Sequence, residues 1–388
     1  MCLLVVTACS GRTDPATVRT RITTDLGNVL HETQAASHLA MPGAIAVGYV
    51  LPSIPAAPDP DAALAWLTNE VFTDADYLGG DMFRFPAESV CKTAGVVDPA
   101  CVAAVDRAEL RIRVVADDAL HFYLQLGPDH DEPIDILVKH DELSITADLD
   151  GASSALLAVA AALGAEAPDA QLAGQVTFDL KLAGTAHVLA ALAIDRPVAV
   201  ALAGPDGALD GDGALRFAAP AGELAAIELD AGARTFTGHL DLAGITAHAP
   251  GHDYMIATGT GEAAFDGTAL ELTGLALSAS ESVGGRVAAT IALTEMSATL
   301  TSANGLETLV PAPRLELASF SDHTALGDVA PTYDVTHLVI DGSVRADATM
   351  VAVTTGAFSV ATSPAQFSFV ASAGECVTAD PWALAACN

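Results

Sequence analysis

The stretch ELRIRVVADDALHFYLQLGPDHDEPIDILVKHDELSITADL, Glu109–Leu149, decides the fold class of this chain. Apolar residues recur there at every second position in four short runs, separated by polar turns. Because successive side chains of a strand point to opposite faces, this period predicts strands with one buried face. Short polar turns join neighbouring antiparallel strands, so we expect an antiparallel meander. The runs are Leu110, Ile112 and Val114; Leu120, Phe122, Leu124 and Leu126; Ile134, Ile136 and Val138; and Leu143, Ile145, Ala147 and Leu149.

Beyond Gln171 the sequence indicates strand after strand, with Gly, Asp and Asn in the turns. The pattern Leu, charge, Leu, small, Gly occurs at 180–184, 240–244 and 270–274. Alternation would point the leucines inward, and the glycine permits a bulge or a turn. The pattern is either a degenerate repeat of a strand unit, as in sandwiches or elongated β stacks, or the usual end of a Leu-rich strand.

Helices are expected mainly before residue 109. Asp14-Pro15 supplies an N-cap and a proline in the first turn, and apolar residues then recur at helical spacing to about Leu39. Asp59-Pro60 and Asp98-Pro99 are typical of two further helix starts, the last of them in a short helix that holds Cys101.

One more helix is predicted between Asp150 and Glu166, a stretch without a charged residue. A helix that is apolar all round must be covered on nearly all sides, so we place it in the concave face of the meander. Its candidate ligand-lining residues are Leu156, Leu157, Val159 and Leu163.

The resulting fold class is α+β and mainly β. We expect residues 1–8 to be the remnant of a signal peptide and residues 9–108 to form an N-terminal helical region. Residues 109–170 hold the meander and the apolar helix, and residues 171–388 form a further β-rich sandwich or elongated sheet.

The composition restricts the classes of partner. The chain has 49 acidic and 16 basic residues and a formal net charge of −33 at pH 7. Binding to nucleic acid needs a basic surface that displaces counterions, so nucleic acid is excluded as a partner. An anionic membrane would also repel this surface, so attachment to a membrane requires an acyl anchor.

The segment Val6-Thr7-Ala8-Cys9, followed by Ser10, resembles the lipobox of bacterial lipoproteins. The resemblance implies cleavage before Cys9, lipidation of its sulfur and, from Ser10, attachment to the outer membrane facing the periplasm or the surface. Only the last part of a signal peptide precedes Cys9, so we expect the true start to lie further upstream. The alternative is a short apolar tail with a chance cysteine.

Four further cysteines, Cys91, Cys101, Cys376 and Cys387, form two sequence-local pairs. An even number at this spacing is typical of disulfides in an oxidising compartment and independently predicts export. The spacing is too wide for zinc knuckles. Three connectivities are possible, and we predict the local pairs Cys91–Cys101 and Cys376–Cys387.

The best metal candidate is the group His239, Asp241, His248, His252 and Asp253. His239 and Asp241 share a face of a predicted strand, and two histidines flank a Pro-Gly turn, so they could converge on zinc. The alternative is a set of solvated turn histidines.

The sequence contains no recognised catalytic signature and no phosphate-binding glycine loop, so we expect no cofactor and no enzymatic activity. We favour a non-catalytic envelope lipoprotein that acts as a structural or binding module, with an envelope protein or a hydrophobic ligand as its partner. One alternative is a carrier that shelters an acyl chain in a curved sheet. Another is a metal-dependent hydrolase that uses the histidine group.

Lipidation gives the first testable prediction. When the protein is expressed with its full upstream signal, it should partition into detergent because of the acyl chains on Cys9. The Cys9→Ser variant should stay in the aqueous phase. Equal partitioning of both proteins would place the anchor elsewhere.

Overall fold

The computed structural model describes sixteen stretches of the chain. They are residues 14–40, 60–72, 76–79, 81–84, 86–93, 96–108, 111–116, 118–126, 131–150, 169–184, 187–303, 306–331, 334–346, 350–363, 368–379 and 382–387. Cys9 and the four candidate ligand-lining residues between 156 and 163 lie outside them. Among the helices within these stretches, none has the length and apolarity that crossing a membrane requires.

A long helical rod opens the described chain, consisting of α1 (Pro15–Arg21), the π-helical η1 (Ile22–Leu26) and α2 (Gly27–Ala40). Asp14 caps it as predicted, because its Oδ1 accepts hydrogen bonds from the backbone N–H groups of Ala16 and Thr17, both at 3.0 Å. At 1.5 Å per residue the rod is about 39 Å long. It can therefore cross several strands.

The two other predicted helix starts are also present. The helix α4 (Pro60–Ala65) continues into η2 (Trp66–Val71), and α6 (Pro99–Ala108) begins after Asp98, whose Oδ1 accepts from the N–H of Ala100 at 2.9 Å. Two short helices complete the set in the described ranges, α5 (Ala87–Val90) and α8 (His323–Leu326).

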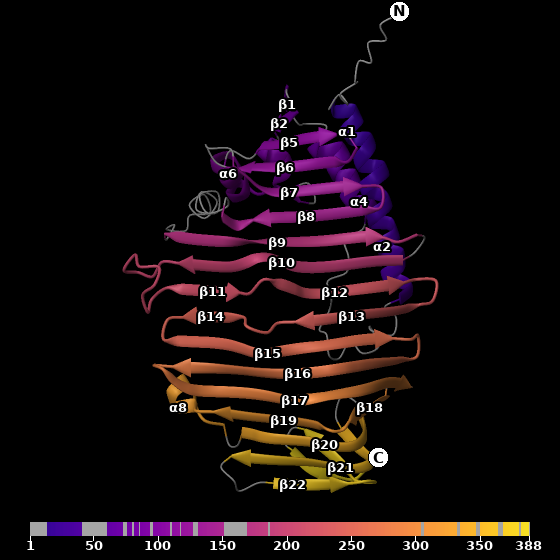
Figure 1. The fold of residues 1–388 in the computed structure, drawn as a ribbon, viewed down its shortest axis with the longest axis vertical. Helices are drawn as coiled ribbons and strands as arrows, with labels where there is room; N and C mark the ends of the chain where they lie inside the picture. The colour runs from indigo at the N-terminus through magenta and orange to yellow at the C-terminus, as the bar shows by residue number, and fades with distance from the viewer. Residues whose placement is uncertain are drawn as a thin grey trace, which may run out of the picture.

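Strands make up most of the molecule (Figure 1), which confirms the mainly β, α+β fold class. Except for β3 (Lys92–Thr93) and β4 (Val96–Val97), they form one 22-stranded sheet. Its strands are β1 (Asp76–Gly79), β2 (Met82–Arg84), β5 (Arg111–Ala116), β6 (Leu120–Leu126), β7 (Asp131–Lys139), β8 (Glu142–Asp148), β9 (Ala170–Leu182), β10 (His187–Leu202), β11 (Leu215–Ala219), β12 (Gly222–Asp230), β13 (Thr235–Asp241), β14 (Thr246–Ala249), β15 (His252–Phe265), β16 (Ala269–Val283), β17 (Arg286–Ala303), β18 (Leu306–Ala312), β19 (Leu315–Ser321), β20 (Asp334–Ala346), β21 (Met350–Ser363), β22 (Ser368–Ser372), β23 (Cys376–Ala379) and β24 (Trp382–Ala385).

The sheet is an antiparallel meander in which most strands pair with the next along the chain or with the next but one, whereas β2 pairs with β5 and β11 with β14. Several departures from strict succession occur where one long strand faces two shorter ones. For example, β11 and β12 both pair with β10, and β18 and β19 both pair with β17. Pro220 and Pro313 lie at these two breaks, where a proline without an N–H cannot continue the ladder. Strands β8 and β9 pair directly, so one sheet runs through residues 111–148 and on to the C-terminal strands.

The repeated Leu, charge, Leu, small, Gly pattern coincides with irregular backbone. Gly184, Gly244 and Gly274 have φ of 85°, 81° and 60°, a region that favours glycine. Gly184 follows the end of β9, Gly244 lies between β13 and β14, and Gly274 lies where the β16 register shifts. Alternation places Leu240 on the same face as the buried Phe236, as expected, although Leu240 is 45% exposed.

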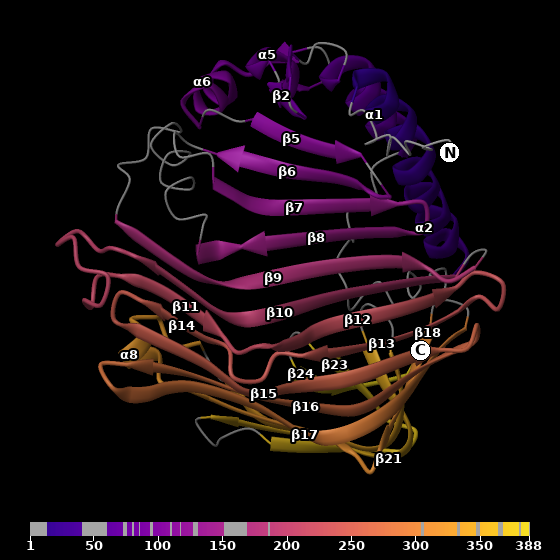
Figure 2. The ribbon, with the colours of Figure 1, turned by 45° about the horizontal axis from the view of Figure 1, so that its top comes forward.

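One face of the sheet carries the buried side chains, and we call it the core face; the other is the outer face. A cross-strand row on the core face joins Val188, Leu229, Phe236, Phe265 and Leu270 through paired positions on five strands. Val29 of α2 is fully buried against this row. In Figure 2, β23 and β24 lie behind β13–β15, so the sheet curves around its core face.

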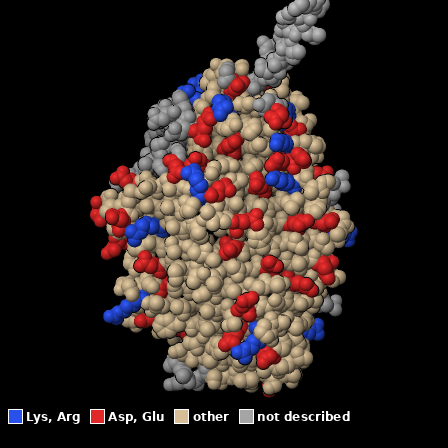
Figure 3. Space-filling model, viewed as in Figure 1, with Lys and Arg blue, Asp and Glu red and all other residues tan. Residues whose placement is uncertain are grey.

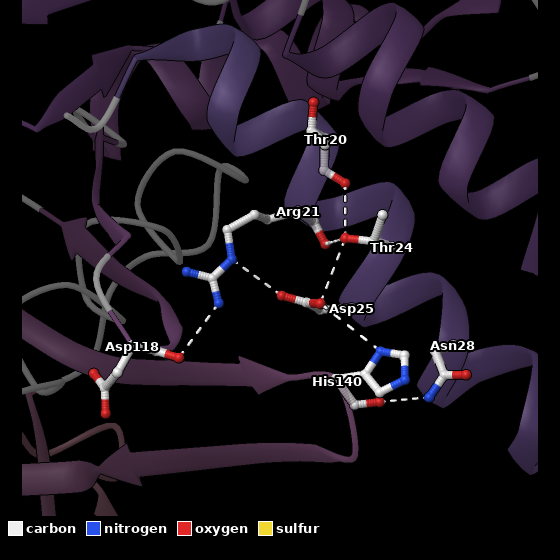
Figure 4. Close-up of polar contacts among 7 residues, drawn as sticks. All are labelled: Thr20, Arg21, Thr24, Asp25, Asn28, Asp118 and His140. Atoms are coloured by element: carbon white, nitrogen blue, oxygen red, sulfur yellow. Dashed lines mark hydrogen bonds and ion pairs between the residues drawn. The ribbon is translucent and has the colours of Figure 1, made fainter. Parts of the chain in front are cut away.

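Polar contacts fix the rod to the sheet at η1 (Figure 4). Arg21 Nε lies 3.0 Å from Asp25 Oδ2, and Arg21 also donates to the carbonyl oxygen of Asp118 at 3.4 Å. One turn further on, the Asn28 side chain donates to the carbonyl oxygen of His140 at 2.5 Å. These contacts reach the turns before β6 and after β7. They set the direction in which α2 crosses the sheet.

Both predicted disulfides are present. Cys91 is bonded to Cys101 and Cys376 to Cys387, with Cα–Cα distances of 5.6 and 5.2 Å. These distances are ordinary for a disulfide. The local connectivity is thus confirmed, and stitching of the two ends of the chain is excluded.

The pairing of β20 with β21 gives a prediction about stability. A Cβ at Gly356 (φ 72°) would lie 1.8 Å from the backbone oxygen of Asp341, whereas a Cβ at Gly374 (φ 91°) would have nothing within 4 Å. Gly374→Ala therefore costs only the left-handed conformation, about 1 kcal/mol. Gly356→Ala should cost more than about 3 kcal/mol in denaturant unfolding, because a backbone oxygen must move. Similar losses for the two variants would contradict this close approach.

Candidate functional site

The outer face of the middle strands carries an open trough of about 610 Å³. A row of paired positions crosses it through Ala201, Arg216, His248, Asp253 and Ser282. Five of the other eleven lining residues are alanine or serine, and these small side chains leave room for the trough. Figure 3 shows this side of the molecule, where an area without charged residues lies below the middle and a further group of charged residues lies near the bottom.

His248 and Asp253 face each other in the trough across β14 and β15. The imidazole Nδ1 lies 2.6 Å from Asp253 Oδ1, and the His248 side chain is 11% exposed. Its Nε2 is buried and has no hydrogen-bond partner among the described residues. A carboxylate that holds Nδ1–H leaves Nε2 as an acceptor, but burial closes that atom to a ligand. The pair therefore joins two strands.

The structure does not bring the predicted metal group together, which corrects that hypothesis. His248 pairs with Asp253, and Ala249 pairs with His252, so the two histidines lie on opposite faces. His252 Nδ1 contacts Glu281 at 2.7 Å, and His239 Nε2 contacts Glu223 at 2.8 Å. Asp241 Oδ1 accepts from the N–H of Ala243. Nowhere in the described ranges do three His, Cys, Asp or Glu side chains gather as a metal would need.

Pairing with a carboxylate is a general property of the histidines in this protein. Each of the nine described histidine side chains has a carboxylate oxygen within 4.0 Å. These are His31, His121, His140, His187, His239, His248, His252, His323 and His337. Most of the pairs join neighbouring strands. His239, His248 and His252 lie on strands and His248 is 11% exposed, so the alternative of solvated turn histidines does not describe the group either.

A polar network lies on the outer face of β5–β7. Arg113 donates to both oxygens of Glu132, at 2.7 and 2.6 Å, and its guanidinium lies 3.9 Å from the centre of the Tyr123 ring. Gln125 donates to Glu132 at 2.7 Å. The hydrogen bonds from Arg113 lower the pKa of Glu132, and burial raises the pKa of Tyr123. The network joins the three strands β5, β6 and β7.

A second hollow, of about 330 Å³, lies on the core face of β15–β17. Alternation assigns six of its lining side chains to this face: Tyr254, Ile256, Ala279, Glu281, Ala289 and Ile291. Ile256, Ala279 and Ile291 are paired in register, and Tyr254 lies opposite Glu281. We call this site the apolar hollow. Its character is aliphatic and aromatic, with one carboxylate.

Next to the apolar hollow, four leucines form a straight row across β16, β17, β19 and β20. Leu277 pairs with Leu293, Leu293 with Leu317, and Leu317 with Leu338. We call this the leucine row. None of the four is fully buried, although they lie on the same face as the protein core. On β15 the neighbour of Leu277 is Gly259, which has no side chain to cover the row.

Sequence reasoning did not find this site. Leu277 and Leu293 each lie in an alternating run, which is a signal for a strand, but which leucines face each other depends on strand register. The predicted ligand-lining helix is a separate proposal, and its residues lie outside the described ranges.

Comparison of the whole chain with protein-family models, with curated proteins and with solved structures finds no match in any of the three.

The Glu132 network gives a prediction about pH. The folded pKa of Glu132 lies below its ordinary value, so its pair with Arg113 stabilises the fold above about pH 4.3, the unfolded pKa. That contribution is lost as the pH falls through the folded pKa. Arg113→Gln should therefore cost about 1 kcal/mol in urea unfolding at pH 6 and less at pH 3.

The control for this experiment is Arg345→Gln, which removes one positive charge from an exposed position on β20. Its cost should be small. If Arg113→Gln loses the same free energy at both pH values, the ionised Glu132 pair does not contribute as described.

Proposed function

We propose that this protein is a non-catalytic binding module whose core-face groove, formed by the apolar hollow and the leucine row, holds a long apolar chain. The observation that carries the proposal is the exposure of large apolar side chains on the face that should be buried. Phe217, Tyr254 and Ile291 are each about 40% exposed there. The proposal corresponds to the alternative of a carrier that shelters an acyl chain in a curved sheet. The residues that form the groove were not predicted from the sequence.

The exposed surface is continuous in register. Phe217 shares a cross-strand row with Tyr254, and Ile291 lies one core-face position from Leu293 on β17. Soluble proteins rarely leave a large contiguous apolar patch uncovered, and such patches mark binding sites. Small-molecule sites are typically mostly apolar hollows of a few hundred Å³, with a small number of polar groups. The apolar hollow and its single Glu281 fit that description.

The position of α2 explains why this half of the core face is uncovered by the rod. The helix packs on β9, β10 and β12, where Val29 is buried beside Val188 and Leu229. The apolar hollow lies on β15–β17, several strands away. At about 4.8 Å per strand, the rod ends before it could cover these strands.

The rival functions have less support. A hydrolase needs converging groups, and the predicted metal residues are divided between two faces. A purely structural module would be expected to bury the leucine row in a closely packed core. Export, lipidation at Cys9 and attachment to the outer membrane remain part of the proposal. The two disulfides support an oxidising compartment.

The groove predicts saturable binding of a neutral fluorescent long-chain alcohol. Ile291→Asp, which places a charge in the apolar hollow, should weaken binding by about tenfold or more, because burial of one large aliphatic side chain is worth about 1.5–3 kcal/mol. Ile291 is 39% exposed, so the fold should survive.

Val310→Asp is the matched control. Val310 is 43% exposed and lies on the outer face of β18, where its partner is Thr299. The control should bind the alcohol as the unchanged protein does. Absence of saturable binding, or equal losses in both variants, would remove the apolar groove as the binding site.

A further inference from the structure

A tight hairpin sets the position of one arginine beside the apolar hollow. Strands β16 and β17 are joined by Gly284 and Gly285, with φ of 57° and 77°. Two central residues with positive φ form the turn that best matches the twist of a two-residue hairpin. The turn fixes Arg286 opposite Val283, which itself pairs with His252. By alternation all three lie on the core face.

Arg286 lies close to the rim of the apolar hollow. Val283 is two residues from Glu281 along β16, which corresponds to about 7 Å. Arg286 is exposed, and Glu281 lines the hollow. Arg286 therefore lies at the hairpin end of the two strands, β16 and β17, that carry most of the hollow.

The nearby carboxylate is already engaged. His252 Nδ1 lies 2.7 Å from Glu281 Oε1, and the His252 ring stacks on the Tyr254 ring. A hydrogen bond to Glu281 also raises the pKa of Tyr254. Two side chains therefore hold Glu281 on the floor of the hollow.

Arg286 itself has no ion pair or side-chain hydrogen bond with any described residue. Several other arginines of this acidic chain form ion pairs with carboxylates. Arg113 binds Glu132, Arg196 binds Asp148 and Asp150, and Arg314 binds Glu316. With 49 acidic residues available, a cation without a partner beside an apolar hollow is complementary to an anionic ligand.

We infer that the ligand of the groove is a long-chain carboxylate whose head binds Arg286 and whose hydrocarbon chain lies in the apolar hollow along the leucine row. This inference rests on the proposed function and names the class of ligand. A guanidinium presents two parallel N–H groups that match the two oxygens of a carboxylate. Glu281 would repel a doubly charged phosphate head more strongly than a carboxylate.

The test compares hexadecanoic acid with hexadecanol as competitors of the neutral fluorescent alcohol, using the full chain at pH 8 and low salt. The unchanged protein should bind the acid about tenfold more tightly than the alcohol, because the acid gains a charge-assisted pair. Arg286→Gln should abolish this preference and leave binding of hexadecanol unchanged. Arg286→Lys should restore part of it.

Arg345→Gln is the matched control, because it removes an equal charge from an exposed position that alternation places on the outer face of β20. It should keep the preference for the acid. If both competitors bind and Arg286→Gln does not change their ratio, the inference about the head group is wrong and the groove stands. If neither competitor binds, the proposed function itself is wrong.

Discussion

The register of the antiparallel ladder is the constraint on which the rest of this molecule depends. A slip of one residue between two strands would exchange their core and outer faces. The long pairings, such as β16 with β17, contain register shifts that are local and confined to bulges. Between the bulges, Leu277 and Leu293 stay opposite each other, and so do Glu281 and Ala289. The leucine row and the apolar hollow exist only because this alignment holds.

The second constraint is coverage. A sheet that buries one face needs a second layer, and the rod from Pro15 to Ala40 provides it only for part of the sheet. On β9, β10 and β12 the helix α2 covers the core face, and Val29 is buried there beside Val188 and Leu229. Toward β20–β23, curvature brings Phe358 and Val377 into a further core. The strands between these regions carry apolar side chains without full burial, and this difference is the physical basis for the proposed groove.

The features of the fold and the candidate site that could be predicted are those decided by residues close together in the sequence. The meander at 109–149 and the Asp14 cap were predictable, because alternation and capping involve neighbours in the sequence. The local disulfides were predictable from spacing. The metal group was not, because His248 and His252 flank a tight turn and their relative face depends on which residues pair across it. Sequence spacing suggested convergence, whereas Ala249 opposite His252 places them apart.

The leucine row could not be predicted for the same reason, because it depends on pairing between strands. Leu277, Leu293, Leu317 and Leu338 come from four separate runs, and no local pattern aligns them. Arg286 could be identified as a member of a Gly-Gly hairpin, but its unpaired state becomes visible only when every neighbouring carboxylate has been placed. Properties that depend on several strand registers at once therefore had to come from the structure.

The short outermost strands have a consequence for how the molecules behave toward one another. The free borders of the sheet are formed by β1 at one end and by β22 and β24 at the other, with four, five and four residues. A long sheet edge recruits further strands and leads to aggregation, and short edges reduce that hazard. The Cys376–Cys387 bond ties the chain just after β24 back to β23. The short borders and this bond thus reduce the tendency of a 22-stranded sheet to grow end to end into a fibre.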